Sequence, residues 1–155
     1  MGESILVKLR EEHQTIRDLL QKTEKAVDVA QKKELYLQAE DEIISHMDSE
    51  EKTIYRHLIE DVGNEESEEV AHDAEDEHEE IRNLCEKLDN THIETKDWDT
   101  AFHQLKKQFL DHIQNEENAL FAEAREDFSK EELMDFGEEY ENAKGESHPR
   151  FFNCQ

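Results

Sequence analysis

The sequence predicts an all-α fold, an up-down-up-down antiparallel four-helix bundle made of two repeated helical hairpins, with a short fifth helix at the C-terminus. Three observations predict it. Apolar residues recur at spacings of three, four and seven along four long segments, which is typical of helices that turn one face to a core. Only four glycines and one proline interrupt the 155 residues, which favours long helices with short connections. The second half of the chain also repeats the pattern of the first.

The apolar stripes predict four long helices, whose ends follow from breaks in the pattern. They cover about residues 3–27, 32–61, 65–89 and 97–126. Gly63 and Asn64 form a strong break between the second and third helices, because glycine adopts the left-handed conformation that ends many helices. Asn90 and Thr91 end the third helix, and Asp28 is the single marker of the first break.

A capping box predicts the fifth helix. Ser129 and Glu132 have the spacing at which two side chains cap each other's backbone amides, so a helix is expected over about residues 130–143. The bundle and this helix are expected to form one domain, residues 1–144. An irregular tail that includes His148 is expected over residues 145–155.

The chain contains two copies of one hairpin. Residues 11–20 (EEHQTIRDLL) and 76–85 (DEHEEIRNLC) agree at His, Ile, Arg and Leu with an offset of 65. Residues 44–61 (ISHMDSEEKTIYRHLIED) and 110–127 (LDHIQNEENALFAEARED) agree at His, the Glu-Glu pair and the terminal Glu-Asp with an offset of 66. A duplicated hairpin predicts a four-helix bundle with two-fold pseudo-symmetry.

The chain is strongly acidic, with 43 acidic and 18 basic residues and a formal net charge of −25. Phosphate groups repel such a chain, which argues against nucleic acid and anionic membrane surfaces as partners. No apolar run approaches the ~20 residues of a membrane helix, and the N-terminal sequence MGESILVKLR lacks the apolar core of a signal peptide. A cytoplasmic protein is therefore expected. Cys85 and Cys154 make no disulfide framework.

Six polar residues interrupt the apolar stripes at positions that face the core. They are His13, His46, Glu50, His78, His112 and Glu116. In each His-x-x-x-Glu pair the two side chains lie one turn apart on the same face of a helix. Residues equidistant from the turn of an antiparallel hairpin lie side by side, and the midpoints between successive histidines, 29.5, 62 and 95, fall in the three predicted turns. All four histidines are therefore expected at one height in the bundle.

Burying six polar groups at one level is costly unless something pairs with them. Each unpaired amide-like group costs roughly 2–7 kcal/mol, and a lone carboxylate costs far more. Two metal ions would remove this cost if each bound two histidines and if Glu50, Glu116 and a solvent oxygen bridged them. One tetrahedral zinc ion could not use all six residues. A di-iron site is the first expectation, with manganese or zinc as alternatives. The other interpretation is a metal-free hydrogen-bond network.

The order His, His-x-x-x-Glu, His, His-x-x-x-Glu in two hairpins resembles the hemerythrin-like (HHE cation-binding) domain family over about residues 5–127. The resemblance implies that the six residues are the ligands of a di-iron centre with an oxo or hydroxo bridge, in which both glutamates bridge. Oxygen-carrying hemerythrins have an additional histidine one turn before the third-helix ligand, where this sequence has Ala74. His72 lies about 240° around the helix from His78 and points elsewhere.

The first functional expectation is a binding or sensing protein for O2 or a related small ligand, such as nitric oxide or peroxide, with no catalytic residue assigned. The alternative that the resemblance allows is a stress protein that dismutates peroxide or protects iron centres. A metal-free helical interaction domain is a further alternative. Gln108 and Glu42, each four residues before a proposed ligand, are candidate acceptors for imidazole N–H groups, and His57 is expected at the surface or an interface.

Overall fold

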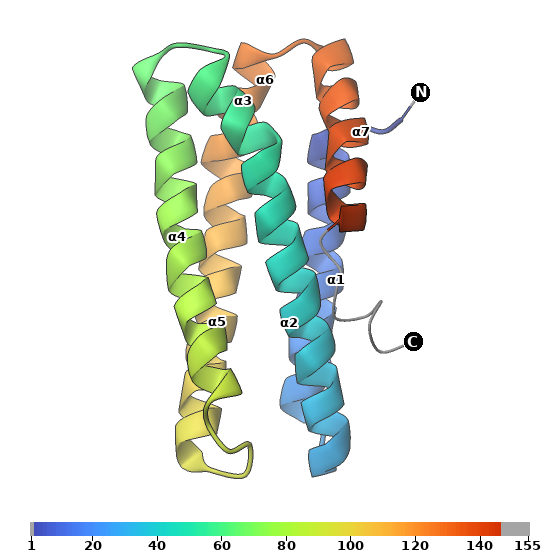
Figure 1. The fold of residues 1–155 in the computed structure, drawn as a ribbon, viewed down its shortest axis with the longest axis vertical. Coiled ribbons are helices and arrows are strands. Elements are labelled where there is room, and N and C mark those ends of the chain that lie inside the picture. Colours follow the sequence, from blue (N-terminus) through green and yellow to red (C-terminus); the bar gives the residue numbers. More distant parts are fainter. Residues whose placement is uncertain (1, 147–155) are drawn as a thin grey trace.

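The computed structural model describes residues 2–146, which form an up-down-up-down four-helix bundle with an additional helix beside it (Figure 1). In chain order the helices are α1 (Ile5–Lys25), α2 (Val29–Lys52), α3 (Ile54–Glu60), α4 (Glu65–Asp89), α5 (Lys96–Asn115), the π-helix η1 (Glu116–Leu120), α6 (Phe121–Asp127) and α7 (Lys130–Glu146). α3 continues the column of α2, and η1 and α6 continue that of α5. The residues described contain no strand, and the predicted fold class is confirmed.

Polar side chains cap the helices at the breaks that the sequence marks. Asp28 Oδ2 accepts a hydrogen bond from the Gln31 amide at 2.9 Å, and Asn64 Oδ1 accepts one from the Ser67 amide at 2.8 Å. Gly63 has a φ of +73°, which a residue with a side chain rarely adopts. The weak signal at Asp28 and the strong signal at Gly63 and Asn64 therefore both mark real helix ends.

The predicted helices over 32–61 and 97–126 are each interrupted, which corrects the expectation of two unbroken helices. Thr53, with φ −118° and ψ −95°, separates α2 from α3. The backbone widens into a π-helix over Glu116–Leu120. Each interruption begins within three residues of a glutamate of the His-x-x-x-Glu pairs. No glycine or proline lies at either place, so the apolar pattern alone could not show them.

The core consists of two apolar clusters. The upper cluster contains Leu9, Ile54 and Phe121 with residues from α4 and α7. The lower cluster contains Ile16 and Phe109 with other buried residues of α1, α2, α4 and α5. The six polar residues predicted at one height belong to neither cluster. They form the layer between the clusters, so apolar side chains lie above and below them along the bundle.

α7 packs against α1 and α2, on one side of the bundle (Figure 1). It lies so close to the N-terminal segment that a Cβ atom built on Gly137 would be 2.3 Å from the carbonyl oxygen of Glu3. The helix runs to Glu146, so Gly145 and Glu146 are helical rather than part of an irregular tail. The rest of the predicted tail, residues 147–155 with His148, lies outside the described residues.

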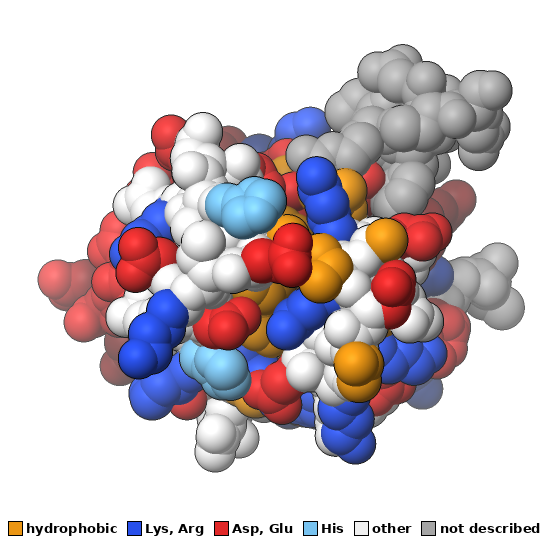
Figure 2. Space-filling view, turned by 90° about the horizontal axis from the view of Figure 1, so that it is seen from below, with side chains coloured by type: hydrophobic (Ala, Val, Ile, Leu, Met, Phe, Trp, Pro, Cys, Tyr) orange, Lys and Arg blue, Asp and Glu red, His pale blue; other side chains and the backbone are white. Residues whose placement is uncertain are grey.

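Charged side chains of both signs are interspersed at the end of the bundle where α1 meets α2 and α4 meets α5 (Figure 2). Val27, in the α1–α2 turn, is 94% exposed. Within residues 2–146, every helix is too short or too polar to cross a lipid bilayer.

Candidate metal centre

The structure brings together all six polar residues that the sequence places at one height. In chain order they come from α1, α2, α4, α5 and the first residue of η1: His13, His46, Glu50, His78, His112 and Glu116. Each residue is at most 2% exposed. Their nitrogen and oxygen atoms form two groups, each with two histidines, and both groups share the two glutamates. Within a group, the atoms that could bind a metal ion lie within 4.8 Å of one another.

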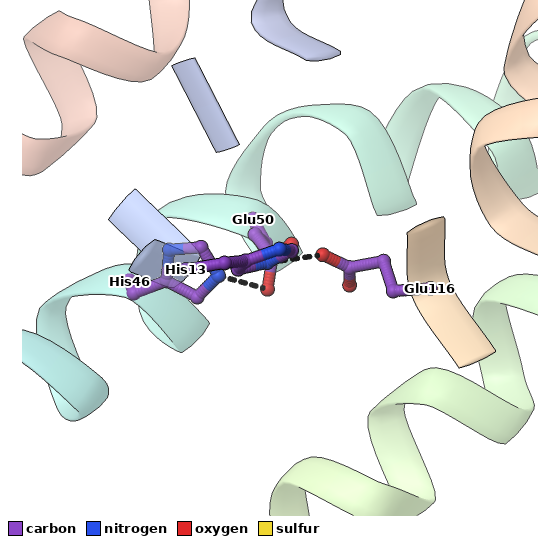
Figure 3. A group of neighbouring side chains, drawn as sticks. All are labelled: His13, His46, Glu50 and Glu116. Carbon is purple, nitrogen blue, oxygen red and sulfur yellow. Dashed lines mark hydrogen bonds and ion pairs between the residues drawn. The ribbon is translucent and has the colours of Figure 1, made fainter. Parts of the chain in front are cut away.

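In the first group, two histidines point toward the shared carboxylates (Figure 3). His13 Nε2 lies 3.1 Å from Glu116 Oε1, and His46 Nε2 lies 3.2 Å from Glu50 Oε1. His46 Nε2 makes no hydrogen bond there, and neither does the buried Glu50 Oε2. A buried polar atom without a partner loses the free energy of its hydration. A cation between these atoms would remove that cost.

In the second group, two histidine nitrogens face each other. His78 Nε2 and His112 Nε2 are 3.1 Å apart. His78 Nε2 is also 3.2 Å from Glu50 Oε1, and His112 Nε2 is 3.5 Å from Glu116 Oε2. Both glutamates therefore belong to both groups and lie between them.

The Nδ1 atom of every central histidine faces a glutamate from another helix of the bundle. The pairs are His13–Glu117 at 2.7 Å, His46–Glu12 at 2.9 Å, His78–Glu51 at 2.6 Å and His112–Glu77 at 2.7 Å. We call these four carboxylates the outer glutamates. Because a carboxylate only accepts hydrogen bonds, each Nδ1 carries the proton. A ring whose single proton is on Nδ1 presents the lone pair of Nε2 to the centre, which is the form in which imidazole binds a metal ion.

The outer glutamates connect the long helices in a closed cycle. The histidine of α1 bonds to η1, that of α5 to α4, that of α4 to α2 and that of α2 to α1. Sequence analysis missed these residues, although a signal was present. Each outer glutamate is the direct neighbour of a central residue, and both hairpins repeat a Glu-His and a Glu-Glu dipeptide: Glu12-His13, Glu77-His78, Glu50-Glu51 and Glu116-Glu117.

The candidates that the sequence suggested for this role were wrong. Gln108 Nε2 donates to Glu80 on the exposed surface, and Glu42 forms an ion pair with Lys144 at 3.2 Å. A position one turn before the histidine on the same helix does not reach its Nδ1, because that atom faces a neighbouring helix.

Positively charged and amide groups support the outer glutamates in turn. Lys144 Nζ is 2.6 Å from Glu12 Oε2, and Arg82 Nη1 is 3.0 Å from Glu51 Oε2. Although burial opposes ionisation, the hydrogen bond and charge of His46 and the charge of Lys144 lower the pKa of Glu12 to about 2. In the same way, burial opposes ionisation of Glu51, but bonds with His78 and Arg82 lower its pKa. These carboxylates remain charged acceptors at neutral pH.

The two central glutamates affect each other's ionisation. Burial, and then the charge of Glu116, raise the pKa of Glu50 well above its ordinary value. Burial also opposes ionisation of Glu116, but hydrogen bonds with Glu50 and His13 hold its pKa well below the ordinary value. Without a cation the pair therefore shares one proton, as expected for two buried carboxylates in contact.

Tyr55 reaches the same centre from α3, and sequence analysis missed it. Its hydroxyl donates to Glu116 Oε2, and it lies 3.3 Å from Glu50 Oε1 and 3.2 Å from His78 Nε2. Its ring stacks on His78, with centroids 5.1 Å apart. Burial, and then the charges of Glu116 and Glu50, raise its pKa well above the ordinary value. At the equivalent position of the second hairpin, Phe121 stacks on His13, so at this position the two halves of the centre differ by one hydroxyl.

Tyr140 links α7 to the centre. Its hydroxyl donates to Glu12 Oε1 and lies 3.0 Å from His46 Nδ1.

Two other histidines lie away from the centre. The His57 side chain, on α3, faces α7 and stacks on Phe136 with ring centroids 3.8 Å apart, which agrees with an interface position. His72 is exposed and pairs with Glu75.

Comparisons with known proteins agree with this geometry. The sequence model of the family described as "Hemerythrin HHE cation binding domain" matches residues 4–124. One curated relative, described as a DNA nickase from Nostoc sp., is 23% identical over 142 residues. The match covers 92% of this chain and 39% of that protein, so this chain spans about two fifths of the length of the relative. No solved structure matches.

Proposed function

Because this chain belongs to the hemerythrin HHE cation-binding domain family, we propose that it holds two iron ions in the layer between its apolar clusters and binds O2, nitric oxide or peroxide there. The proposed ligands are His13, His46, Glu50, His78, His112 and Glu116. Each ion would have two imidazole nitrogens and a share of both carboxylates. Bound iron would supply a change between ferrous and ferric states and a coordination position for the small ligand.

The observation that carries the proposal is the direction of the four imidazole rings. Four carboxylates hold the four Nδ1–H groups, so four Nε2 lone pairs meet around two buried carboxylates. Cations between these six groups would remove the cost of burying them. Imidazole and carboxylate together suit iron first, with manganese and zinc as alternatives.

The surrounding residues would protect such a centre. The outer glutamates fix each ring in its metal-binding orientation and increase its basicity. The apolar clusters on both sides exclude water along the bundle, which strengthens every electrostatic interaction in the layer. The Tyr55 hydroxyl donates a hydrogen bond to Glu116 and therefore reduces the negative charge on one of the two central carboxylates.

Two alternative functions, an enzyme and a metal-free interaction domain, would give different experimental results. An enzyme that dismutates peroxide or protects iron centres would use the same ligands and would show turnover. A metal-free interaction domain would keep its stability in the presence of a chelator. The function named for the Nostoc relative does not extend to this chain, because this chain spans a minor part of that protein and its charge of −25 repels DNA.

The test is the iron content of protein produced with iron supplied and purified without chelator, measured by mass spectrometry of metals. About two iron ions per chain are expected, one for each group of ligand atoms. His112→Ala should lose at least one of them. His103→Ala is the matched control, because His103 is an exposed histidine on the same helix. A wild-type value below about a tenth of an ion per chain after anaerobic reconstitution with ferrous ion would overturn the proposal.

Spectroscopy then separates binding from turnover. The ferrous protein should change its visible spectrum on exposure to O2 or nitric oxide, and reduction should restore the original spectrum. Sustained evolution of O2 from hydrogen peroxide that His112→Ala abolishes would instead support the enzyme alternative.

A further inference from the structure

The two halves of the centre differ in the residue that lies one turn before the histidine of the first helix of each hairpin. Leu9 precedes His13 in α1, and Ala74 precedes His78 in α4, at the equivalent position of the repeat. Leu9 is fully buried in the upper apolar cluster. The methyl group of Ala74 fills much less space, so one side of the centre is less tightly filled than the other.

A pocket of about 250 Å³ occupies that side. It lies between α4 and the end of α5 with η1, and Ala74, Val70 and Leu120 form its apolar wall. Glu116, one of the shared carboxylates of the centre, also lines it, together with Glu77 and Asp73. The pocket therefore extends as far as a residue of the centre.

Two features of the backbone keep this side open. The π-helix η1 begins at Glu116 and forms one wall of the pocket. Bulges of this kind widen a helix locally and occur frequently at functional sites. Within residues 2–146, α7 packs on α1 and α2 (Figure 1), whereas the pocket is lined by α4, η1 and the last residue of α5.

We infer that this pocket is the access route and binding site for an uncharged small molecule, at the half of the centre that His78 and His112 form. The inference rests on the proposed function, since it assigns the place where the small ligand arrives. Glu77, Asp73 and Glu116 give the pocket negative charge, and the whole chain adds to it. Neutral O2, nitric oxide or hydrogen peroxide enter such a pocket more readily than an anion does.

The test fills the pocket with the residue that the other hairpin uses. Nitric oxide is mixed with the anaerobic ferrous protein, and its association rate is measured by stopped flow. Ala74→Leu should slow association by about tenfold or more, and Ala74→Val by less, because a larger side chain raises the barrier to passage. Asn83→Leu, an exposed position on the same helix that does not line the pocket, should leave the rate unchanged.

Iron content distinguishes the two possible failures. Wild-type protein without iron would overturn the proposed function and this inference together. Wild-type and Ala74→Leu proteins that hold equal iron and bind nitric oxide at equal rates would overturn the access route alone. Azide, an anion, should associate with the ferric protein faster as salt is added, and an opposite salt dependence would contradict the role of the acidic wall.

A second measurement needs no metal ion. In a Cys154→Ser background, Ala74→Cys and Leu9→Cys place thiols at the two equivalent positions. A small thiol reagent should modify the first at least about tenfold faster than the second, because only the first borders the pocket. Equal rates would mean that the two sides of the centre are equally closed, and would contradict the inference.

Discussion

Each central histidine depends on one carboxylate for its orientation, and this dependence can be tested at single residues. Glu51 accepts from His78 and also pairs with Arg82, while Asp48 pairs with Arg82 but with no histidine. Glu51→Gln should lower the affinity for ferrous ion about 10–100-fold, the usual effect of removing a carboxylate that holds a metal-binding imidazole. Asp48→Asn should leave the affinity close to that of the wild type. Competition with a coloured chelator measures both, and equal losses in the two variants would contradict this role for Glu51.

The Tyr55 hydroxyl should contribute more to the free energy of unfolding of the metal-free protein than to that of the metal-loaded protein. In the metal-free protein it donates to Glu116 and lies beside Glu50, so Tyr55→Phe leaves a buried carboxylate short of a donor, at a cost of about 1–3 kcal/mol in the free energy of unfolding. In the loaded protein cations would satisfy both carboxylates, and the loss should be smaller. Denaturant unfolding of both forms measures the difference.

Tyr36→Phe is the matched control for that variant. Its hydroxyl donates to Glu40 and lies 3.4 Å from the Cys85 carbonyl oxygen in the lower cluster, away from the central layer. The loss of stability should therefore be the same with and without metal. A larger effect of Tyr55→Phe in the loaded form would show that the hydroxyl does not act through the central carboxylates.

The six central residues were predictable because two patterns agree on them. The helical period places them on the core face, and the repeat places them at one height. The outer glutamates follow the repeat, at offsets of 65 and 66, but they do not lie on the apolar face of a helix. With 43 acidic residues in the chain, the repeat alone does not tell which of them bond to a histidine, because that depends on the rotation of the neighbouring helix. Tyr55 was not predicted either, because the break at Thr53 changes the direction in which its side chain points.

At the scale of elements, the apolar periodicity and the capping residues predicted the helices and their ends. Tertiary contacts determined the two interruptions within the long helices. Asp28, Asn64 and Ser129 cap helices as their residue types favour. The break at Thr53 and the π-helix at Glu116 lie in segments with good helical periodicity and without glycine or proline. The first comes three residues after Glu50 and the second begins at Glu116, which indicates that the packing of the polar layer, rather than local propensity, determines them.

The contact between α7 and the N-terminal segment predicts opposite effects for two glycines of one helix. Alanine normally stabilises a helix interior by about 1 kcal/mol relative to glycine. At Gly137 the added Cβ would meet the Glu3 carbonyl oxygen at 2.3 Å, so backbone must move and Gly137→Ala should destabilise the protein by about 1–3 kcal/mol.

Gly145 is the control for this prediction, because a Cβ there would meet no atom of residues 2–146 within 4 Å. Gly145→Ala should therefore be neutral or slightly stabilising. Chemical denaturation of the two variants and the wild type gives the comparison. If both substitutions changed the free energy of unfolding in the same direction, α7 would not hold its close position against the N-terminal segment in solution.

At the scale of the whole molecule, the net charge of −25 opposes compaction. Raising the salt concentration from about 10 mM to about 150 mM shortens the screening length from ~30 Å to ~8 Å. The melting temperature of the metal-free protein should therefore rise by several degrees, as thermal unfolding followed by circular dichroism would measure. A melting temperature that falls with salt would show that surface ion pairs, such as Lys106–Glu24, outweigh the net repulsion.

The cycle of outer glutamates also bears on how the chain folds. The bonds His46–Glu12 and His112–Glu77 lie within single hairpins and span 34 and 35 residues, whereas His13–Glu117 spans 104. Short loops close first, because the entropy lost on closure grows with loop length. Each hairpin can therefore orient one histidine while the chain is still partly folded, but the ring of α1 acquires its partner only when the two hairpins dock. The last bond to form completes the binding site, so metal uptake reports on the final step of folding.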